Sequence, residues 1–570
     1  MSIHEGFLCL GSPLWDGHPG PDLGRRAATQ AATQAGTNAA MQAAWQLSIA
    51  RRGLANTAAA LTGGFAVASS NPAGDAWLAV DRFAVQTLCY RLADGRLRFA
   101  ERADDLADAA TEIDPQASFD YLYFHCIPSP RTIFKGVFRL PPGHCAEFTR
   151  GQLTVKPYWV AEFTEPVAAS YDSSRDEFRD ILKRSVQRQL DGSKAACFLS
   201  GGTDSSSVAG LIGQVAGKPA ATYSIGFEAA GYDEMAFARI AANRFGTEHH
   251  EYYVTPDDLV QGIAHVAGSY DQPFGNSSAL PAYYCAKFAR EDGVTKLLAG
   301  DGGDELFGGN SRYAMQRIFG WYGRLPAAIR SGVMEPLFQP GAFKGVPLLG
   351  KGAGYVNQAK VPMPDRLQMY NLLRRLGFAE VLTPGFLSQV SPDDAARQQR
   401  EVWAQAKAHD PINRTLAYDW RYSLAESDLP KVRGTTQLAG VGVGFPFLDD
   451  ELLAFSMRLP AEYKLKGLKL RWFFKEALRG FLPDEILTKK KQGFGLPFGV
   501  WATQHAALNA LAVDSLRSFG DRRIVRPEFI DTLLKLHLPA HPGYYGEMVW
   551  ILMMLEQWMR KHAPAFSLRG

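Results

Sequence analysis

One stretch of this 570-residue chain limits its possible folds more than any other: residues 198–206, which read FLSGGTDSS. A short apolar run, AACFLS, leads into two glycines, and a helical pattern, SSVAGLIGQVAG, follows them. A strand, a glycine loop and a helix in this order form the unit from which parallel sheets with helices on both faces are built. The stretch therefore predicts an α/β fold with the loop at the end of a buried strand.

The same loop has the chemistry of a phosphate-binding site. Glycines let backbone N–H groups approach an anion closely, and the start of a helix adds unpaired N–H groups with a partial positive charge. Ser200 and Ser205 can donate hydrogen bonds to phosphate oxygens, whereas the Asp204 carboxylate would repel them unless Mg²⁺ bridged the two. An ordinary helix cap is the alternative interpretation. The loop has neither the Walker G-K-[ST] sequence nor the dinucleotide fingerprint.

The pattern along the chain changes near residue 170. Before that point, alternating runs such as GGFAVASS, AWLAVD, LCYRL and LRFAER predict strands joined by hairpins. Residues 27–60 are rich in Ala, Gln and Thr, and we interpret them as a surface helix or a loose insertion. Further on, helical patterns alternate with short apolar strands, and from about residue 310 the chain is mostly helical. Because 570 residues are too many for one core, we expect two domains, residues 1–165 and 172–565.

Composition and charge narrow the class of protein. Hydrophobic residues make up 46% of the chain, and its net charge of +3 comes from well-mixed acids and bases, so nothing indicates a nucleic acid or an anionic membrane as partner. The longest apolar run near the C-terminus, residues 548–555, is far shorter than the ~20 residues of a membrane helix, and the N-terminus has no signal-peptide pattern. The six cysteines form no C-x-x-C pair, which favours isolated thiols in a reducing compartment. We therefore expect a cytoplasmic protein.

Four segments carry a resemblance to a known family. SGGTDSS resembles the SGGxDS loop of the ATP-pyrophosphatases, which cleave ATP between the α- and β-phosphates. AGDGGDELFGG at 299–309, GVGVGFPFLD at 440–449 and KKKQGFG at 489–495 resemble three segments of the asparagine synthetases, in the same order and with similar spacing. SIGFEAAGYDE and FGTEHHE also fit. Over roughly residues 120–560, the chain is therefore identified as similar to the asparagine synthetase family.

The resemblance implies a fold and a reaction. The expected fold is an N-terminal Ntn-hydrolase-like β-rich sandwich, followed by a synthetase domain with a parallel sheet flanked by helices and a helical C-terminal part. The expected reaction is that of an AMP-forming carbon–nitrogen ligase that uses ATP and Mg²⁺. A substrate carboxylate attacks the α-phosphate of ATP and forms an acyl-adenylate with release of pyrophosphate. An amine then attacks the acyl carbon and releases AMP.

The resemblance also implies roles for individual residues. Asp204 and Asp304 are the expected Mg²⁺ ligands, and Lys491 is expected to steady the pyrophosphate and the charge that develops at phosphorus. Asp301 and Glu305 are candidates for substrate contacts or proton transfer, with helix capping or ion pairing as the alternative. The remaining expected nucleotide contacts are Leu199, Ser200, Gly201, Gly202, Ser205, Ile225, Gly226, Gly302 and, on the pyrophosphate, Lys431.

The N-terminal region departs from the family in the residues that hydrolyse glutamine. The family's glutaminase uses a cysteine at position 2, whereas this chain has Ser2, and Cys9 is too far along to become the terminal residue. The glutamine-binding segment NGEIYN is missing, although GGFAVASS and DYLYFHCIPSPRTIFKGVFRLPPGH resemble the family's scaffold. We therefore predict a degenerate domain without glutaminase activity, and ammonia or a substrate amine as the nucleophile.

Further departures bear on the acceptor. Gly442 and Gly444 replace a Glu and an Arg of the family, and Asn276 replaces an Asp, which weakens the case for aspartate. A small-molecule or a peptide carboxylate is expected, and the assembly can be a homodimer. The alternatives are a lasso-peptide cyclase or another intramolecular amide-forming synthetase, and a sugar-modifying amidotransferase that docks an ammonia-producing partner. β-Lactam synthetases fit less well, because they have an aromatic residue at the place of Asp301. A non-catalytic ATP-binding scaffold would not need Asp204, Asp304 and Lys491.

Overall fold

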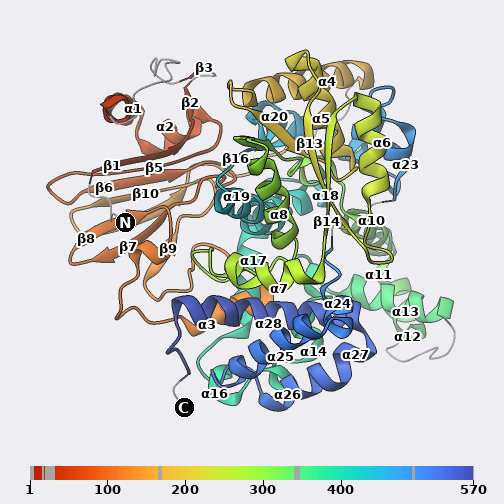
Figure 1. The fold of residues 1–570 in the computed structure, drawn as a ribbon. Coiled ribbons are helices and arrows are strands. Elements are labelled where there is room, and N and C mark those ends of the chain that lie inside the picture. Colours follow the sequence, from red (N-terminus) through yellow and green to blue (C-terminus); the bar gives the residue numbers. More distant parts are fainter. Residues whose placement is uncertain are drawn as a thin grey trace.

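A computed structural model of the chain describes residues 6–15, 18–19, 32–164, 170–338, 347–490 and 495–568. Its N-terminal part contains two antiparallel sheets that pack face to face (Figure 1). The first sheet has the order β1 (Phe7–Gly11), β5 (Phe65–Ser70), β6 (Ala76–Val80), β10 (His144–Thr149) and β11 (Gln152–Pro157). The second has the order β8 (Arg96–Ala100), β7 (Cys89–Ala93) and β9 (Val137–Arg139). A small third sheet joins β3 (His18–Pro19), β2 (Leu14–Trp15) and β4 (Leu61–Thr62).

The Ala-, Gln- and Thr-rich segment forms two helices, α1 (Ala32–Arg52) and α2 (Leu54–Ala60). Trp45 of α1 is fully buried and stacks on Trp77 of β6, with ring centroids 5.5 Å apart. The prediction of a surface helix is confirmed, since most of the side chains described in α1 are exposed or half-buried, whereas the alternative of a loose insertion is wrong because Trp45 anchors the helix. A few large side chains anchor α1, so the segment shows no continuous apolar stripe.

Side-chain alternation in β5 explains how one sheet is covered on both faces. Ala66 and Ala68 pack toward the second sheet, where small side chains let the two layers approach. Phe65 and Val67 point the other way and pack with Trp45 of α1. The predicted hairpin-rich sandwich is therefore present, with α1 and α2 covering its outer layer.

The second part of the fold is organised around a five-stranded parallel sheet. Its order is β14 (Glu248–Val254), β13 (Ala221–Phe227), β12 (Ala195–Phe198), β15 (Lys296–Leu298) and β16 (Gly442–Gly444). Cys197 packs toward α4 (Tyr171–Gln189), α5 (Thr203–Ala216) and α6 (Met235–Phe245). Its neighbour Ala196 packs toward α8 (Ala279–Glu291) on the opposite face. The predicted fold class, a β-rich sandwich followed by a parallel sheet flanked by helices and a helical C-terminal part, is confirmed.

Beyond β15, the described part of the chain consists mainly of helices. Its strands there are β16 and the two-stranded hairpin of β17 (Leu465–Lys466) and β18 (Lys469–Leu470). None of the helices in the described ranges is long and apolar enough to cross a membrane. The longer helices beyond α8 are α10 (Ser311–Arg324), α13 (Pro347–Lys360), α17 (Pro392–Gln405), α18 (Pro411–Asp419), α19 (Leu429–Leu438), α20 (Asp450–Arg458), α25 (Ala506–Gly520) and α28 (Pro542–His562).

Helix α28 joins the N-terminal and C-terminal parts into one core. It packs on α7 (Pro256–Ala267), α24 (Phe498–Gln504) and α25, and most of its side chains are buried. Tyr121 of α3 (Pro115–Phe124) donates a 2.9 Å hydrogen bond to the carbonyl oxygen of Ile551 in α28. The blue C-terminal helix and the orange segment that carries α3 therefore lie side by side (Figure 1).

Candidate active site

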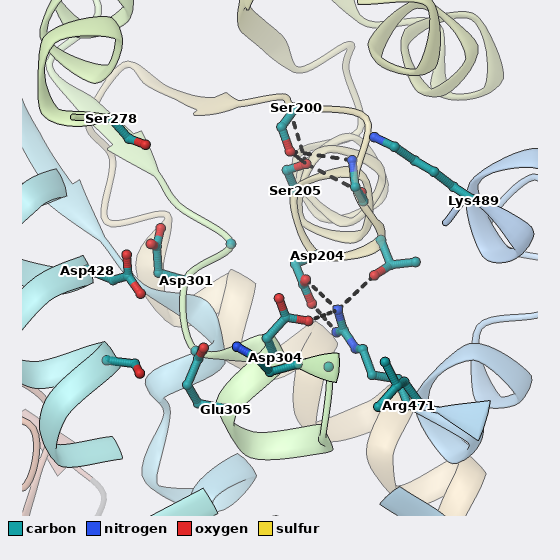
Figure 2. A pocket seen from close by; sticks show the side chains of 18 of the residues that line it. Ser200, Asp204, Ser205, Ser278, Asp301, Asp304, Glu305, Asp428, Arg471 and Lys489 are labelled. Atoms are coloured by element: carbon teal, nitrogen blue, oxygen red, sulfur yellow. Dashed lines mark hydrogen bonds and ion pairs between the residues drawn. The ribbon is translucent and has the colours of Figure 1, made fainter. Parts of the chain in front are cut away.

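A large cavity opens where the direction of the parallel sheet's connections reverses. The chain runs outward from β12 to β13 and β14, and then returns to place β15 on the other side of β12. Loops that follow two such adjacent strands diverge and leave a crevice, which is where open α/β sheets bind ligands. The loops after β12 and β15 line a cavity of about 1220 Å³ (Figure 2). This volume is large enough for a nucleotide and an acceptor together.

Hydrogen bonds to serine hydroxyl groups stabilise the conformation of the loop after β12. The backbone N–H of Ser200 donates to Ser205 Oγ at 3.2 Å, and the two serine hydroxyls lie 3.1 Å apart. Gly201 has φ of +68°, and a Cβ there would overlap the backbone of Phe237 and Ala238 in α6. The glycine is therefore required both by the backbone conformation and by the packing of α6.

Helix α5 begins at Thr203, slightly earlier than the sequence indicates, and its N-cap is Gly202. No side chain caps this helix end with a hydrogen bond. The alternative interpretation of the loop as an ordinary cap therefore lacks its expected hydrogen bond. Uncapped N–H groups beside a glycine turn are the arrangement that binds anions.

The two predicted metal ligands lie together, and an arginine joins them. Arg471 Nη1 donates to Asp204 Oδ2 at 2.6 Å, to Asp304 Oδ1 at 2.8 Å and to Thr203 Oγ1 at 2.9 Å. Its Nη2 atom donates to the other oxygen of Asp204. Figure 2 shows both carboxylates turned toward this guanidinium. Burial opposes the charged form of Arg471, but the two carboxylates raise its pKa above the usual value.

The donor set fits a magnesium ion that is shared with phosphates. Gly303 and Gly309 pack against Asp204 and Asp304, and a Cβ at either glycine would overlap a carboxylate. The described part of the chain contains no group of three or more His, Cys, Asp or Glu side chains placed to hold a metal. In nucleotide sites, one or two carboxylates bind Mg²⁺, and phosphate oxygens and water fill its remaining coordination positions.

A lysine lies between two further carboxylates on the opposite side of the cavity. Lys431 Nζ lies 2.9 Å from Asp428 Oδ1 and 3.4 Å from Asp301 Oδ1. Burial opposes its charged form, but Asp428 and Asp301 raise the pKa of Lys431 above its ordinary value. Burial raises the pKa of Asp301, and the ion pair with Lys431 acts in the opposite direction. Lys431 therefore stays charged, and burial makes Asp301 a better proton acceptor than an ordinary exposed carboxylate.

A local widening of one helix brings these groups into the cavity. α18 continues through a π-helical segment, Trp420–Asp428, into α19. Such π-helical turns are frequently found at functional sites, because they change which side chains share a face. One face of this continuous helix supplies part of the cavity wall: Tyr418, Tyr422, Ser423, Ser427, Asp428, Lys431 and Val432.

Most of the sequence-predicted residues line this one cavity. Gly201 and Gly226 do not, because Gly201 packs on α6 and Gly226 lies against Tyr253 and Asp233. Lys491 and Ser2 lie outside the described residues. The predicted residues that line the cavity are Leu199, Ser200, Gly202, Asp204, Ser205, Ile225, Asp301, Gly302, Asp304, Glu305 and Lys431.

Sequence reasoning missed several charged residues of the cavity. Arg471 and Lys475 lie in a stretch without a recognisable motif, so no signal identified them. Lys489, whose Nζ lies 2.9 Å from Glu234 Oε1, belongs to the KKKQGFG segment, and the run of three lysines was an available signal. Asp428 lies three residues before Lys431, and this helical spacing could have identified it.

The N-terminal part of the chain also contributes to the cavity wall. Tyr123 and Phe124 at the end of α3 line it together with Tyr422, and Phe124 stacks on Tyr422 with ring centroids 5.4 Å apart. Asn276, which precedes α8, donates a 3.1 Å hydrogen bond to Ser427 Oγ. Part of the cavity wall is therefore aromatic, and the N-terminal part of the chain supplies two of its rings.

None of the six cysteines, all of which lie in described ranges, is an activated thiol. Cys9 is half-buried and the other five are buried, and none forms a disulfide. Burial raises the pKa of Cys9 to about 11 and that of Cys126, which lines the cavity, to about 12. These thiols stay protonated at neutral pH, and a thiol in that form is a poor nucleophile.

Both parts of the chain match known protein families. Residues 177–560 match the family model described as asparagine synthase, and residues 35–159 match the glutamine amidotransferase domain. The chain is 25% identical over 492 residues to glutamine-hydrolyzing asparagine synthetase 1 of Bacillus subtilis (strain 168), covering 84% of this chain and 74% of that relative. It is 25% identical over 381 residues to glutamine-hydrolyzing asparagine synthetase 3 of the same organism, covering 64% of this chain and 55% of that relative.

A further relative has a different name. Amidase chyE of Penicillium rubens is 23% identical over 469 residues, with 74% of this chain and 67% of that relative covered. The asparagine synthase match alone spans more than half of the chain and contains both cavity loops. The chain therefore belongs to the asparagine synthase family.

Proposed function

We propose that the chain is an ATP-dependent, AMP-forming ligase that activates a carboxylate and transfers it to an amine. The observation that carries this proposal is the convergence of the phosphate loop and the Asp204–Asp304 pair in one cavity that is large enough for a nucleotide and an acceptor. Family membership independently supports a ligase that forms carbon–nitrogen bonds. The division into domains at residues 1–165 and 172–565 is part of the proposal.

The proposed reaction has two steps. A carboxylate oxygen of the acceptor attacks the α-phosphorus of ATP, and the bond to the leaving pyrophosphate breaks. The amine nitrogen then attacks the acyl carbon, and the carbon–oxygen bond to AMP breaks. Mg²⁺, held by Asp204 and Asp304, would neutralise phosphate charge when bound.

The remaining residues would bind and orient the reactants. The N–H groups in the first turn of α5, which no side chain caps, and the hydroxyl groups of Ser200 and Ser205 would hold phosphate oxygens. Lys475, Lys489 and Lys491 would add positive charge. On the acceptor side, Asp301 and Asp428 would bind the incoming amine as an ammonium. Asp301, whose pKa burial raises, is suited to take the proton that the nitrogen loses.

We propose further that the N-terminal domain does not hydrolyse glutamine. The protonated state of all six described cysteine thiols and the serine at position 2 support this proposal. The amine would then be free ammonia or part of the substrate.

A second candidate is an amide-forming synthetase whose acceptor is larger than aspartate, such as a peptide cyclase. The family's arginine is replaced by Gly444, where a Cβ would lie 2.4 Å from Gln189 Oε1 and 2.8 Å from Leu298, so a larger side chain would require Gln189 to move. Without that cation, the second carboxylate of an aspartate substrate loses a partner. The cavity instead offers a larger substrate an aromatic surface, formed by Tyr123, Phe124 and Tyr422.

Mass spectrometry of the products tests the proposal. Protein, ATP, Mg²⁺ and aspartate are incubated with glutamine in one sample and with ammonium in another. Asparagine, AMP and pyrophosphate with ammonium alone support an ammonia-dependent asparagine synthetase. Asparagine in both samples contradicts the inactive N-terminal domain. AMP in neither sample removes aspartate as the acceptor, and calorimetry with Mg·ATP then decides between a ligase for another acid and a protein that binds no nucleotide.

A further inference from the structure

We propose that Arg471 is a built-in counter-ion for the two metal-binding carboxylates, so that a divalent cation enters this site only together with a nucleotide. The proposal deepens the proposed function and rests on its placement of Mg·ATP at Asp204 and Asp304. It makes Arg471 a positioning residue that controls the order in which metal and nucleotide bind.

The contacts of Arg471 are those that a divalent cation would make. A single nitrogen, Nη1, bridges Asp204 at 2.6 Å and Asp304 at 2.8 Å, and Nη2 completes a two-point contact with Asp204. Because both carboxylates lie within hydrogen-bond distance of one atom, they are near enough to share one ion. The guanidinium and a metal ion cannot both occupy that position, because their charges repel each other.

The surroundings of Arg471 hold it at this place. Its side chain is about 6% exposed, and the guanidinium carbon lies 3.9 Å from the centre of the Phe474 ring. Its backbone has φ of +54°, a left-handed conformation that non-glycine residues adopt at a cost and that clusters at functional sites. The buried Nε atom has no hydrogen-bond partner among the described residues. Both the strained backbone of Arg471 and its unpaired buried Nε atom cost free energy, which a purely structural role of this residue does not explain.

Electrostatics explain why such a counter-ion is useful. Two carboxylates that are half-buried side by side repel each other, and without a cation they would separate or take up a proton. Arg471 offsets this repulsion and keeps the two carboxylates close together while no nucleotide is bound. A metal ion alone must break several charge-assisted hydrogen bonds to enter, whereas a metal ion with ATP brings phosphate oxygens that offer the displaced guanidinium new partners.

Metal binding without nucleotide provides the test. Manganese(II) is titrated into the full-length protein without ATP, and bound ion is measured by electron paramagnetic resonance. We expect the wild type to bind weakly and Arg471→Met to bind about tenfold to a hundredfold more tightly, since charged hydrogen bonds of this strength no longer oppose the ion. The midpoint of thermal unfolding should rise with Mn²⁺ alone in the variant and only with Mn²⁺ and ATP together in the wild type.

Three further variants make the result specific. Arg479→Met removes a half-exposed arginine at the rim of the same cavity, paired with Glu476 and Asp484, and should leave Mn²⁺ binding as in the wild type. Adding Asp304→Asn to Arg471→Met should remove the gained affinity. Arg471→Lys, which keeps a charge but not the two-point contact, should bind Mn²⁺ with intermediate affinity and serves as the test should Arg471→Met fail to fold.

The outcomes separate the two proposals. Equal Mn²⁺ affinity in the wild type, Arg471→Met and Arg471→Lys, with Mn·ATP binding intact, would overturn the role of Arg471 alone. Wild-type protein that binds Mn²⁺ equally well with and without ATP would do the same. Absence of Mn·ATP binding in the wild type would instead contradict the proposed function, while the titration without ATP would still decide whether Arg471 competes with the ion.

Discussion

At the scale of single residues, the two carboxylates at Asp204 and Asp304 should decide nucleotide binding. Asp204→Asn and Asp304→Asn each remove one charge from the metal-binding pair, so Mg·ATP affinity measured by calorimetry should fall by about a hundredfold or more, as in the loss of one charged contact worth ~3 kcal/mol. Asp172→Asn, on the exposed first turn of α4, is the matched control and should bind as the wild type does. Near-wild-type affinity in either cavity variant would contradict the metal assignment.

A second prediction at this scale concerns pH. Burial raises the pKa of Asp81 to about 6, although four backbone N–H groups, those of Phe65, Phe83, Val85 and Gln86, donate to its carboxylate. The folded state therefore holds a proton more tightly than the unfolded state, whose carboxyl group has its ordinary pKa. This stabilisation, about 3 kcal/mol in full, is present below the ordinary pKa and is lost as pH rises through about 6.

Urea unfolding of the wild type and of Asp81→Asn at about pH 5 and about pH 7 measures this effect. The wild type should gain stability relative to the variant when the pH is lowered from 7 to 5, because only the wild type can take up the proton. A difference that stays constant or shrinks on acidification would mean that the four N–H donors outweigh burial.

Residues in recognisable motifs were predictable, and residues that act by filling space or neutralising charge were not. Asp204 and Asp304 follow glycine loops at strand ends, so their meeting in one cavity follows from the α/β topology. Arg471 lies far along the chain in an unremarkable sequence, and only the folded packing brings its guanidinium to them.

At the scale of elements, the phosphate loop should depend on Gly201 for more than its backbone angle. Gly201 and Gly217 flank α5 and have φ of +68° and +65°, but only at Gly201 would a Cβ overlap neighbouring backbone. Gly217→Ala should cost about 1–2 kcal/mol of stability and leave Mg·ATP binding intact. Gly201→Ala should abolish binding, because the loop must move away from α6. Calorimetry on both variants decides, and equal binding would show that the loop tolerates the shift.

Helices and strands with a clear periodicity of apolar residues were predictable from the sequence, whereas β16 and the π-helical segment Trp420–Asp428 were not. The first four strands of the parallel sheet alternate with helices along the chain, as the sequence predicts. β16 consists of Gly442, Val443 and Gly444, too short and too rich in glycine to indicate a strand. Its pairing with β15 is set by tertiary packing alone.

At the scale of the whole molecule, several ion pairs link the N-terminal part to the synthetase part, and one of them joins Arg82 to Asp450. Arg82 Nη1 lies 2.6 Å from Asp450 Oδ1, and the other oxygen of Asp450 accepts a 2.7 Å hydrogen bond from the N–H of Gly63. Arg82→Met should lower the free energy of unfolding by about 2 kcal/mol, as expected for loss of a partly buried charged hydrogen bond. Arg98→Met, whose partner Asp94 is exposed, should change it by less than about 0.5 kcal/mol. Chemical denaturation compares the two, and equal effects would rule out a special role for the Arg82 pair.

The order of the motifs was enough to predict one shared site, but not what the N-terminal part adds to it. Tyr123 and Phe124 reach the cavity because α3 packs on α28 and Asn371 donates to the carbonyl oxygen of Tyr123 at 2.7 Å. Contacts between segments hundreds of residues apart depend on surface complementarity, which leaves no periodic trace in either segment.

The contact between α3 and α28 has a consequence for how the chain is made. Tyr121 and its partner Ile551 are 430 residues apart, and a ribosome that adds about 5–20 residues per second needs about 20–90 s to make the intervening chain. For that time the apolar side of α3 emerges into the cell without the helix that covers it. Nascent chains should therefore be substrates for chaperones until α28 leaves the exit tunnel, and the emergence of α28 should also be the step that completes the core of the first domain.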